Sequence, residues 1–586
     1  MLRGGLGRAW IAGVFVARSG RFAYPLALMG QGNGTLARKA LARVAVAVAA
    51  AVVLTPALGS GCNLVVDTKA DQCAVDADCA GLGGGRCVAG VCSTGAAARE
   101  CNANAECASR GAFFVCNKAK GACASLKSKE CATVEGDYTD DAAFVIGSIL
   151  PTAGSDKDTG RAMENSIRLA IGDFLDSSNG LPLLPGSTKR PFVLVGCNDN
   201  SDSDTSVAAA RHLVDDVGVP AIIGASFSGI TIKVATTVTI PGGVLLISPS
   251  ATSVAITDLA DDGLVWRTSP SDIYQAKAIA LLMPTIEKAV RDDVELALAA
   301  EDPVRVAILN KGDSYGSGLG KALEKILVIN GKPALDLANQ PAYKRYDYGN
   351  PDDPKTNPPS YADKLKQVLD FKPHVVLLFG TNEAVTDVFT PLVDKWQGTR
   401  PRFLFSDGGL VNDLWVKVGP VADLRKRILG TVPGTNNQLF SSFKQAYNMK
   451  FADGTDPAVF GAAGSYDAAY LLAYASVANG AAPATGANLA KALKRLVPPG
   501  TATAVGAEGV NAAFKALGGG KNVDVEGSSG PLNFDVATGD APSDIQIWCL
   551  PEDPAKKAAS AQNSGQYFDA ATGKLAGAID DATCGR

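Results

Sequence analysis

Short apolar segments alternate with amphipathic segments through the middle of the chain. A short run of consecutive apolar residues is typical of a strand buried on both faces, whereas apolar residues three or four positions apart indicate a helix. From residue 142 onward, apolar runs predict buried strands at 142–150, 191–197, 220–224 and 244–248. Helical patterns separate them, at 162–174, 206–217 and 229–238. Because the strands alternate with helices and are apolar on both faces, we expect a parallel sheet covered by helices on both sides.

The same alternation starts again after Asp272 and predicts a second α/β unit. Its expected helices are 273–290, 317–329 and 384–396, and its expected strands are 304–309, 374–380 and 402–406. A segment rich in Pro, Asp and Asn, 349–360, predicts an exposed loop. Helices rich in Ala and Tyr are expected at 441–479 and 487–496, followed by paired strands at 531–535 and 544–550. From Pro551 onward the sequence predicts a loosely ordered tail that Cys584 holds in place.

The N-terminal part has the charge and hydropathy pattern of a secretory signal. Basic residues precede an apolar core that extends from Val44 to Leu58, and the small residues Gly59, Ser60 and Gly61 lead into a cysteine. The apolar core has 15 residues, whereas a membrane-spanning helix needs about 20. We therefore expect a cleaved signal rather than a transmembrane anchor.

That cysteine, Cys62, stands where exported lipoproteins carry their lipid. Small residues followed by a cysteine resemble the lipobox of bacterial lipoproteins, although Leu58 lies one position early. The resemblance implies that Cys62 is acylated, becomes the mature N-terminus and ties the protein to a membrane. An ordinary signal peptide followed by a disulfide cysteine is the alternative.

The 13 cysteines indicate disulfide bonds, because an exported protein folds in an oxidising compartment. Eight of them form two similar modules, Cys73, Cys79, Cys87 and Cys92 in the first, and Cys101, Cys107, Cys116 and Cys123 in the second. Each module has few large apolar residues and therefore needs covalent cross-links. Zinc binding is the alternative, but neither module contains a CxxC pair. For the four cysteines that follow the modules, one pairing joins Cys131 to Cys197 and Cys549 to Cys584. The sequence alone leaves the connectivity open.

The composition argues against several classes of function. Of 586 residues, 47% are hydrophobic and 19% are charged, which is typical of a globular protein with room for more than one domain. The formal net charge is −4, and no dense run of Lys and Arg occurs outside the signal, so we expect no nucleic-acid partner. The two histidines, His212 and His374, lie far apart, and no nucleophile elbow or P-loop occurs. We therefore expect no enzyme activity, no catalytic residue, no metal site and no cofactor.

The order of motifs from Ala142 to Leu550 resembles the type I periplasmic binding proteins, specifically the branched-chain amino-acid (Leu/Ile/Val) receptor family of ABC importers. The blocks that carry the resemblance are IGSILPTAG (146–154), GRAMENSIRLAI (160–171), DNSDSDTSVAAARHLV (199–214), AIIGASFSGIT (221–231), LLISPSATSVAIT (245–257), WRTSPSDIYQAKAIA (266–280), VAILNKGDSYGSGL (306–319) and GSYDAAYLLAYA (464–475). The order and spacing of the blocks, rather than any one block, make the signal specific.

The resemblance implies two lobes, each a parallel sheet flanked by helices, with a ligand cleft between them. Three chain crossings should join the lobes, near Pro270, Gly434 and Gly530. The expected segments are 1–61 for the signal peptide, 62–131 for a stalk of Cys-rich repeats, 142–270 and 435–530 for lobe I, 271–434 and 531–550 for lobe II, and 551–586 for the tail.

Short polar residues follow two strands of the first unit, at the edge where open parallel sheets bind ligands. Ser228 stands where a helix begins after one strand, and Ser250 and Thr252 follow the next strand. A helix N-terminus offers unpaired N–H groups and partial positive charge, and a hydroxyl adds a donor, which suits a carboxylate. The resemblance implies that these three residues bind the α-carboxylate of the ligand. Helix capping is the alternative role.

The resemblance assigns the ligand's ammonium group to the second unit. Asp407, in FSDGG, matches a family carboxylate, and Tyr315, in DSYGSG, matches a tyrosine at the cleft edge. A carboxylate forms a charge-assisted hydrogen bond with an ammonium, and a tyrosine packs on aliphatic atoms. An Asp-Gly turn and ordinary interlobe packing are the alternatives. Thr159 and Asn382 occupy positions where relatives often have aromatic side chains, so a polar amino acid, an amide or another small carboxylate is also a candidate ligand.

Together these features predict an extracytoplasmic solute-binding lipoprotein that captures a small amino-acid-like ligand for an ABC permease. We expect it in the periplasm or at the cell surface, held at a membrane by its lipid. The Cys-rich repeats are unusual for a simple importer receptor, and they favour the alternative of a ligand-sensing or surface-adhesion protein on the same fold. In both cases we expect reversible binding with lobe closure.

Overall fold

The computed structural model describes most of the chain beyond Ala98. The described residues are 99–183, 188–434, 437–553, 558–559 and 561–584, together with Cys73, Val75, 77–79, 86–88 and 91–93. The chain divides into two compact units, Met1–Ala98 and Arg99–Arg586. The expected signal peptide and Cys62 lie outside the described residues. Within the described ranges, no helix combines the length and the apolar character that crossing a membrane requires.

The cysteines of the two modules pair in the same way, first with third and second with fourth. The disulfides are Cys73–Cys87 and Cys79–Cys92 in the first module, and Cys101–Cys116 and Cys107–Cys123 in the second. Each module contains an antiparallel strand pair, β1 (Arg86–Val88) with β2 (Val91–Ser93), and β3 (Phe114–Asn117) with β4 (Ala122–Ser125). A 3-10 helix, Asn104–Arg110, precedes β3. The predicted disulfides are confirmed, and the thiols that zinc would need are bonded to one another.

The larger unit contains a six-stranded sheet that defines lobe I. Its order is β12 (Val265–Arg267), β11 (Leu245–Ser248), β10 (Ala221–Gly224), β6 (Phe144–Leu150), β9 (Phe192–Asn198) and β5 (Cys131–Glu135). All strands are parallel except β5, which pairs antiparallel with β9 and is joined to it by the disulfide Cys131–Cys197. The parallel sheet and this cysteine pair agree with the sequence-based expectation. The edge strand β5 was not predicted, because its partly exposed residues mix polar and apolar side chains and form no apolar run.

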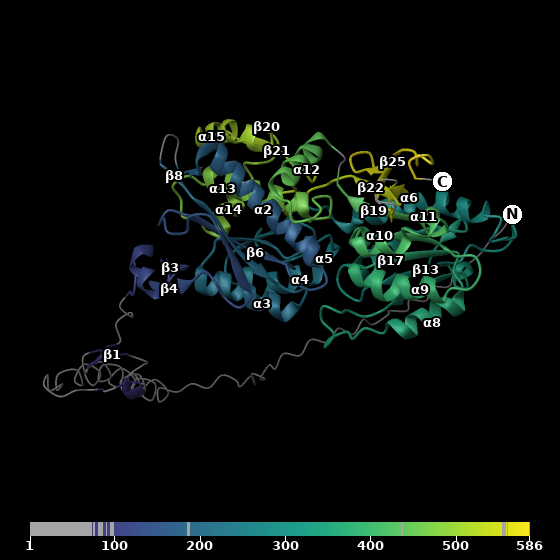
Figure 1. Cartoon of the computed structure of the whole chain (residues 1–586), viewed down its shortest axis with the longest axis horizontal. Coiled ribbons are helices and arrows are strands. Elements are labelled where there is room, and N and C mark those ends of the chain that lie inside the picture. The colour runs from purple at the N-terminus through teal and green to yellow at the C-terminus, as the bar shows by residue number, and fades with distance from the viewer. Residues whose placement is uncertain are drawn as a thin grey trace, which may run out of the picture. The chain divides into compact units, whose positions relative to one another are not determined.

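Helices cover both faces of the lobe I sheet, as Figure 1 shows for α2 and α13 on one side of β6 and for α3 and α4 on the other. The helices are α2 (Lys157–Ser178), α3 (Ser203–Arg211), α4 (Ser228–Val234), α5 (Val254–Thr257), α12 (Gln438–Lys450), α13 (Ala462–Ala478), α14 (Gly486–Leu493) and α15 (Val510–Gly518). Single π-helical turns extend α3 over His212–Val217 and α4 over Ala235–Thr239. Helix α13 is apolar all round and buried from Ala462 to Val477, which places it in the core.

An eight-stranded sheet defines lobe II. Its order is β16 (Tyr343–Asp347), β13 (Val306–Asn310), β17 (Val375–Phe379), β18 (Arg402–Phe405), β19 (Ile428–Pro433), β22 (Ile545–Cys549), β25 (Gln562–Asp569) and β26 (Lys574–Gly577). The first five strands are parallel and the last three are antiparallel. Its helices are α6 (Asp272–Arg291), α7 (Gly316–Glu324), α8 (Tyr361–Phe371), α9 (Thr390–Lys395), α10 (Asn412–Val418) and α11 (Ala422–Arg427). A π-helical turn, Ala384–Phe389, precedes α9.

Short strand pairs complete the description. They are β7 (Leu181–Pro182) with β8 (Lys189–Arg190), β14 (Val328–Ile329) with β15 (Lys332–Pro333), β20 (Thr501–Ala504) with β21 (Val523–Glu526), and β23 (Glu552–Asp553) with β24 (Ala558–Ala559). The remaining 3-10 turns are Leu337–Asn339, Asp407–Gly409 and Ala507–Gly509.

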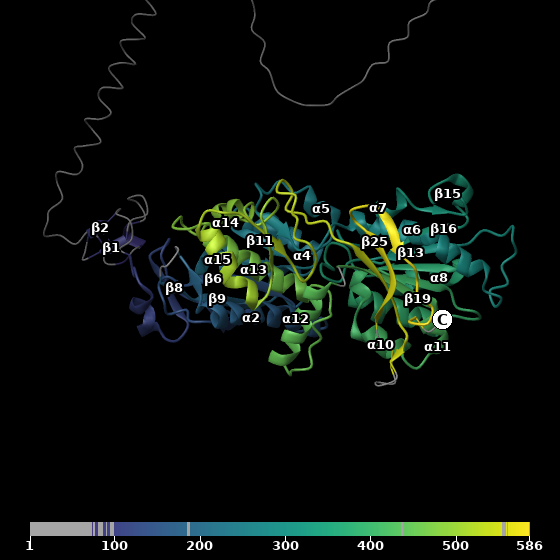
Figure 2. The same ribbon diagram turned by 90° about the horizontal axis from the view of Figure 1, so that it is seen from above.

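The C-terminal segment differs from the expectation of a loosely ordered tail. Strands β25 and β26 extend the lobe II sheet beyond β22, and Figure 2 shows this yellow segment within lobe II. The disulfide Cys549–Cys584 closes the segment, as suggested from the cysteines. The expected pairing of 531–535 with 544–550 is wrong, because β22 pairs with β19 and β25 instead. The prediction failed because the two C-terminal strands are polar and partly exposed, and such edge strands lack a clear apolar run.

Three connections join the lobes, after β12, after β19 and before β22. The third lies later than the expected position near Gly530. Leu532, Phe534 and Ala541 belong to the core of lobe I, and the Phe534 ring lies 5.0 Å from that of Trp266. The chain therefore leaves lobe I between Ala541 and β22, and the segment from 531 to 541 is part of lobe I rather than lobe II.

Candidate functional site

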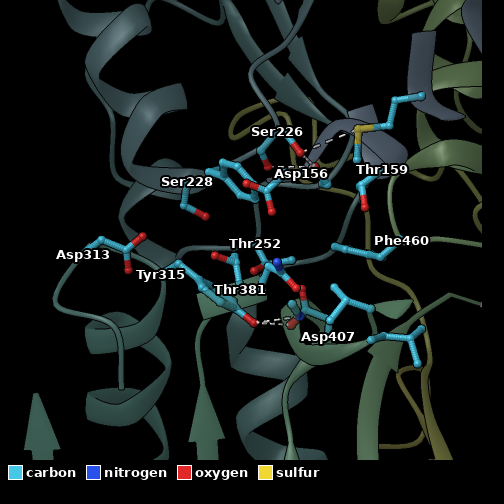
Figure 3. Close-up of a pocket in the computed structure, with 17 residues that line it drawn as sticks. Asp156, Thr159, Ser226, Ser228, Thr252, Asp313, Tyr315, Thr381, Asp407 and Phe460 are labelled. Carbon is cyan, nitrogen blue, oxygen red and sulfur yellow. Dashed lines mark hydrogen bonds between the residues drawn. The ribbon is translucent and has the colours of Figure 1, made fainter. Parts of the chain in front are cut away.

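A pocket lies between the two lobes and brings all seven predicted ligand-binding residues together. Those residues are Thr159, Ser228, Ser250 and Thr252 from lobe I, and Tyr315, Asn382 and Asp407 from lobe II. The other lining residues are Asp156, Met163, Ser226, Phe227 and Phe460 from lobe I, and Asp313, Thr381, Gly408, Leu410 and Val411 from lobe II. With its open mouth included, the pocket encloses about 590 Å³ of empty space. Figure 3 shows Ser226, Ser228 and Asp156 above the pocket, and Tyr315 and Asp407 below it.

Sheet topology explains why residues so distant in sequence converge here. Nearly every lining residue follows the carboxyl end of a parallel strand: β6, β10 and β11 in lobe I, and β13, β17 and β18 in lobe II. These ends lie at one edge of each sheet, and that edge is where open α/β sheets bind ligands. The two lobes present these edges to each other across the pocket.

The lobe I wall is a surface of hydroxyl groups. Ser228 is the first residue of α4, and its Oγ accepts a hydrogen bond from the amide of Ser253 at 3.2 Å. Ser250 Oγ donates to the carbonyl oxygen of Ser226 at 2.7 Å. The N-cap of α4 is Phe227 and has no side-chain cap, so the alternative of helix capping by Ser228 is wrong. The Ser228 hydroxyl hydrogen is left to donate toward the pocket.

Thr252 is the least satisfied of these hydroxyls. Its side chain is buried, and Oγ1 lies beside the Asp272 carboxyl without reaching full hydrogen-bonding geometry. Buried polar groups are nearly always hydrogen-bonded, so an unpaired hydroxyl in a pocket wall is suited to bind a ligand atom.

On the lobe II side, Asp407 is held by two neighbours. Its Oδ1 accepts hydrogen bonds from the Tyr315 hydroxyl at 2.7 Å and from Nε2 of Gln275 at 2.8 Å. Burial raises the pKa of Asp407 to about 6, while the bond from Tyr315 acts in the opposite direction. At neutral pH the side chain is therefore an anchored carboxylate. Its backbone also starts a 3-10 turn, so the predicted Asp-Gly turn is present together with the pocket-facing carboxylate.

Asp272 adds a second carboxylate behind Asp407. It is fully buried at the first position of α6, and its carboxyl lies beside the Thr252 hydroxyl, which falls short of full hydrogen-bonding geometry. Burial, followed by the charge of Asp407, raises its pKa well above the ordinary value. The protonated form is therefore favoured at Asp272, which leaves the negative charge of the pair on Asp407.

Asp156 and Asp313 add two further carboxylates to the pocket wall. Behind them the buried Lys311 ammonium is 2.5 Å from Asp352 and 3.9 Å from Asp313. Burial lowers the pKa of Lys311, but the carboxylates of Asp352, Glu383 and Asp313 more than offset this and hold it above its ordinary value. Lys311 therefore carries a permanent charge that several carboxylates share.

Thr159 and Asn382 make part of the pocket wall polar, as expected where relatives have aromatic side chains. The aromatic lining comes instead from Phe227, Tyr315 and Phe460. A larger cavity adjoins the pocket at Phe460 and Leu410 and is bounded by the interlobe connections, but none of the seven predicted residues lines it.

Several site residues were not predicted. Asp156, Asp313 and Thr381 follow strands β6, β13 and β17, so their positions after apolar runs were a usable signal. Gln275 lies within a helix and Phe460 lies in the connection between α12 and α13, and neither position has a distinguishing pattern.

Comparison with known proteins gives one family and many similar structures. A family model described as periplasmic binding protein matches residues 144–513. Among curated proteins, none matches the chain.

The solved structures share the fold at low sequence identity. The isoleucine complex of LivJ, a branched-chain amino acid transporter substrate binding protein from Streptococcus pneumoniae, has a TM-score of 0.50 and 16% identity, covering 72% of this chain and 99% of LivJ. The leucine binding protein LivK from Thermotoga maritima has a TM-score of 0.51 and 18% identity, with coverages of 71% and 97%. A solute binding protein of an ABC transporter from Rhodopseudomonas palustris, in complex with 3,4-dihydroxybenzoic acid, has a TM-score of 0.51 and 17% identity, with coverages of 75% and 99%.

Proposed function

The chain belongs to the periplasmic binding protein family, and from this membership we propose that it captures a small amino-acid-like ligand between its lobes for an ABC importer. The ligand's carboxylate binds the hydroxyl wall, where Ser228 and Thr252 donate to it and Ser250, whose own hydroxyl donates to the Ser226 carbonyl, lines the site beside them. Its ammonium group binds Asp407, which Tyr315 and Gln275 hold in place. Binding is reversible and is accompanied by closure of the lobes.

One observation carries the proposal: hydroxyl donors on one lobe and an anchored carboxylate on the other line a single pocket. A zwitterion needs both kinds of partner, spaced apart, and charge-assisted hydrogen bonds to each end are strong. Two of the similar structures described above are complexes, one with isoleucine and one with an aromatic acid, and both ligands carry a carboxylate. The hydroxyl wall suits that shared group.

A thermal-shift screen of the purified full chain tests the proposal. Amino acids, short-chain amides and small carboxylates are added singly, and a ligand that binds the folded state raises the melting temperature. The Ser228→Ala and Asp407→Asn variants should abolish the shift, whereas Asp413→Asn, at an exposed position of α10, should retain it. Retained binding in both pocket variants would contradict the assigned site. A screen without any shift would contradict the function.

We also propose that a lipid on Cys62 tethers the protein on the outer side of a membrane. The support is the sequence pattern, together with a family whose members act outside the cytoplasm. Metabolic labelling with a fatty acid should mark the chain and should fail for Cys62→Ala. Labelling that persists in the variant would place the lipid elsewhere, and absent labelling of the native chain would favour the ordinary signal peptide.

A sensing or surface receptor is the second candidate. The two disulfide modules before lobe I favour it, because solute delivery alone does not require them. Deletion of the gene separates the two functions: an importer receptor is needed for uptake of the ligand, whereas a sensor is needed for the response to it.

A further inference from the structure

Resting on the proposed function, we propose that the ligand is an amino acid whose side chain ends in a cationic group, an ammonium or a guanidinium. Asp156 and Asp313, the other two carboxylates of the pocket wall, bind this second positive charge. The ligand class is therefore that of the basic amino acids rather than the aliphatic ones.

The charges of the pocket wall are the first argument. Three carboxylates line the pocket, those of Asp156, Asp313 and Asp407, and no Lys or Arg is among the described lining residues. An amino acid with an uncharged side chain offers a single ammonium group, which Asp407 neutralises. The ligand's own carboxylate binds the hydroxyl wall and, being negative, neutralises none of the carboxylates of the pocket. Asp156, which forms no ion pair among the described residues, would then face an uncharged side chain without a counter-charge, and Asp313 would keep only its part of the Lys311 charge. Leaving a carboxylate without a counter-charge in a closed pocket is costly.

Lys311 neutralises Asp313 only in part, because the same ammonium also serves Asp352 and Glu383. Asp313 Oδ1 accepts a hydrogen bond from the amide of Gly316 at 2.8 Å, while its Oδ2 is 3.9 Å from the Lys311 ammonium. Lys311 is closer to Asp352, at 2.5 Å, so its charge is already engaged. Asp313 also faces lobe I, since a Cβ placed on Gly229 would lie 3.9 Å from Oδ2. A ligand cation between the lobes can therefore reach this carboxylate.

Asp156 has neutral partners only. Its Oδ2 accepts hydrogen bonds from the hydroxyls of Ser201 at 2.7 Å and Ser155 at 2.9 Å. Among the described residues, no Lys or Arg forms an ion pair with it. It occupies the N-cap position of α2, but its side chain does not cap that helix. The carboxylate is thus positioned by hydroxyls and keeps its charge for a ligand.

The polar residues at the aromatic positions of relatives agree with this ligand class. Thr159 and Asn382 line the pocket together with Thr381, so the side-chain end of the ligand meets hydroxyl and amide groups. A leucine side chain would leave these groups without partners, whereas the N–H groups of an ammonium or guanidinium can donate to them.

Isothermal titration of the purified full chain tests the proposal with L-lysine, L-ornithine and L-arginine against L-leucine and L-glutamine. We expect the best basic amino acid to bind at least about tenfold more tightly than either neutral one. Putrescine, a diamine without a carboxylate, should bind far more weakly than ornithine if the hydroxyl wall is used. Leucine or glutamine binding as tightly as the basic amino acids would overturn this inference and leave the proposed function standing. No binding of any amino acid would overturn the proposed function itself.

Variants then locate the second cation. Asp156→Asn should weaken lysine binding by about tenfold or more and leave glutamine binding within about twofold. Asp158→Asn is the matched control, because Asp158 is exposed two residues further along α2. Asp313→Asn provides a second variant with the same expectation. Equal losses for lysine and glutamine, or unchanged lysine binding in both variants, would contradict the assignment of Asp156 and Asp313.

Discussion

The hydroxyl of Tyr315 lies 2.7 Å from Oδ1 of Asp407, and both side chains are buried at the floor of the pocket. The same hydroxyl is 2.7 Å from Oγ of Ser406, and the amide of Gln275 donates to the same carboxylate oxygen. Two other segments of lobe II, those of Gln275 and Tyr315, thus fix one acidic side chain. A carboxylate held in this way needs no reorganisation when an ammonium group arrives, which favours binding.

Removing this contact should weaken ligand binding. In Tyr315→Phe the ring is kept, but the hydrogen bond that lowers the pKa of Asp407 is lost, so the carboxyl becomes easier to protonate. We expect a loss of affinity of about five- to tenfold at pH 7, the usual net value of one hydrogen bond. Binding titrations at pH 7 and at pH 8.5 should show a smaller loss of affinity at the higher pH. An equal loss at both would mean that Tyr315 acts by packing alone.

Ligand binding should also depend on pH. Burial raises the pKa of Asp407 to about 6. Below pH 6, Asp407 of the free protein is therefore protonated and offers no negative charge to the ligand's ammonium group. We expect affinity for an amino-acid ligand to fall by about tenfold per unit as the pH decreases below 6, because a proton must leave before the ligand binds. The profile should be unchanged for Asp413→Asn, whereas Asp407→Asn should show no binding at any of these pH values. A flat profile in the native chain would mean that Asp407 does not bind the ammonium.

The sequence predicted the parts of this site that follow apolar strands. Ser228, Tyr315 and Asp407 each come soon after a buried run, and parallel strand ends meet at one edge of a sheet. Gln275 could not be predicted, because its role depends on the packing of α6 against lobe II rather than on periodicity. The fold was predictable for the same reason, since buried parallel strands are continuous apolar runs. The edge strands β5 and β26, and β25 next to the edge, were missed because partly exposed strands mix polar and apolar residues.

Asp199 should destabilise the protein at neutral pH. Burial raises its pKa to about 7, and its Oδ2 has no partner among the described residues, while Oδ1 accepts from the amide of Ser201. The folded state therefore binds a proton more tightly than the unfolded state, and this group's contribution to the free energy of unfolding decreases as the pH rises from about 4 to about 7.

We expect Asp199→Asn to be more stable than the native chain at pH 8, by up to the roughly 4 kcal/mol that a shift of three units represents. The difference should shrink at pH 5, and Asp176→Asn, exposed on α2, should show neither effect. Urea unfolding at the two pH values checks this. A variant less stable than the native chain at pH 8 would mean that the carboxylate is stabilised by its surroundings.

Lys311 should be required for stability. Its side chain is buried, with the ammonium 2.5 Å from Asp352 and 3.3 Å from the Thr381 hydroxyl. Lys311→Met leaves the neighbouring carboxylates without a counter-charge, and removing one partner of a buried pair typically costs about 3–5 kcal/mol. Because burial has already raised the pKa of Asp352 to about 7, the loss should be smaller at pH 5. Lys366→Met, in an exposed pair with Asp370, should cost less than about 1 kcal/mol.

The disulfide Cys549–Cys584 should hold the C-terminal strands in the lobe II sheet. It joins the end of β22 to the segment after β26, so β25 and β26 lie within the loop that it closes. Replacing both cysteines by alanine should lower the free energy of unfolding by about 2–4 kcal/mol. Protease cleavage should also increase in the exposed turn between β25 and β26, since these two strands have few buried side chains to retain them.

The matched variant lacking Cys131–Cys197 should lose a comparable stability without increased cleavage there, because that disulfide joins β5 to β9 in lobe I. Equal cleavage in the two variants would mean that strand pairing with β22, rather than the disulfide, retains the C-terminal segment.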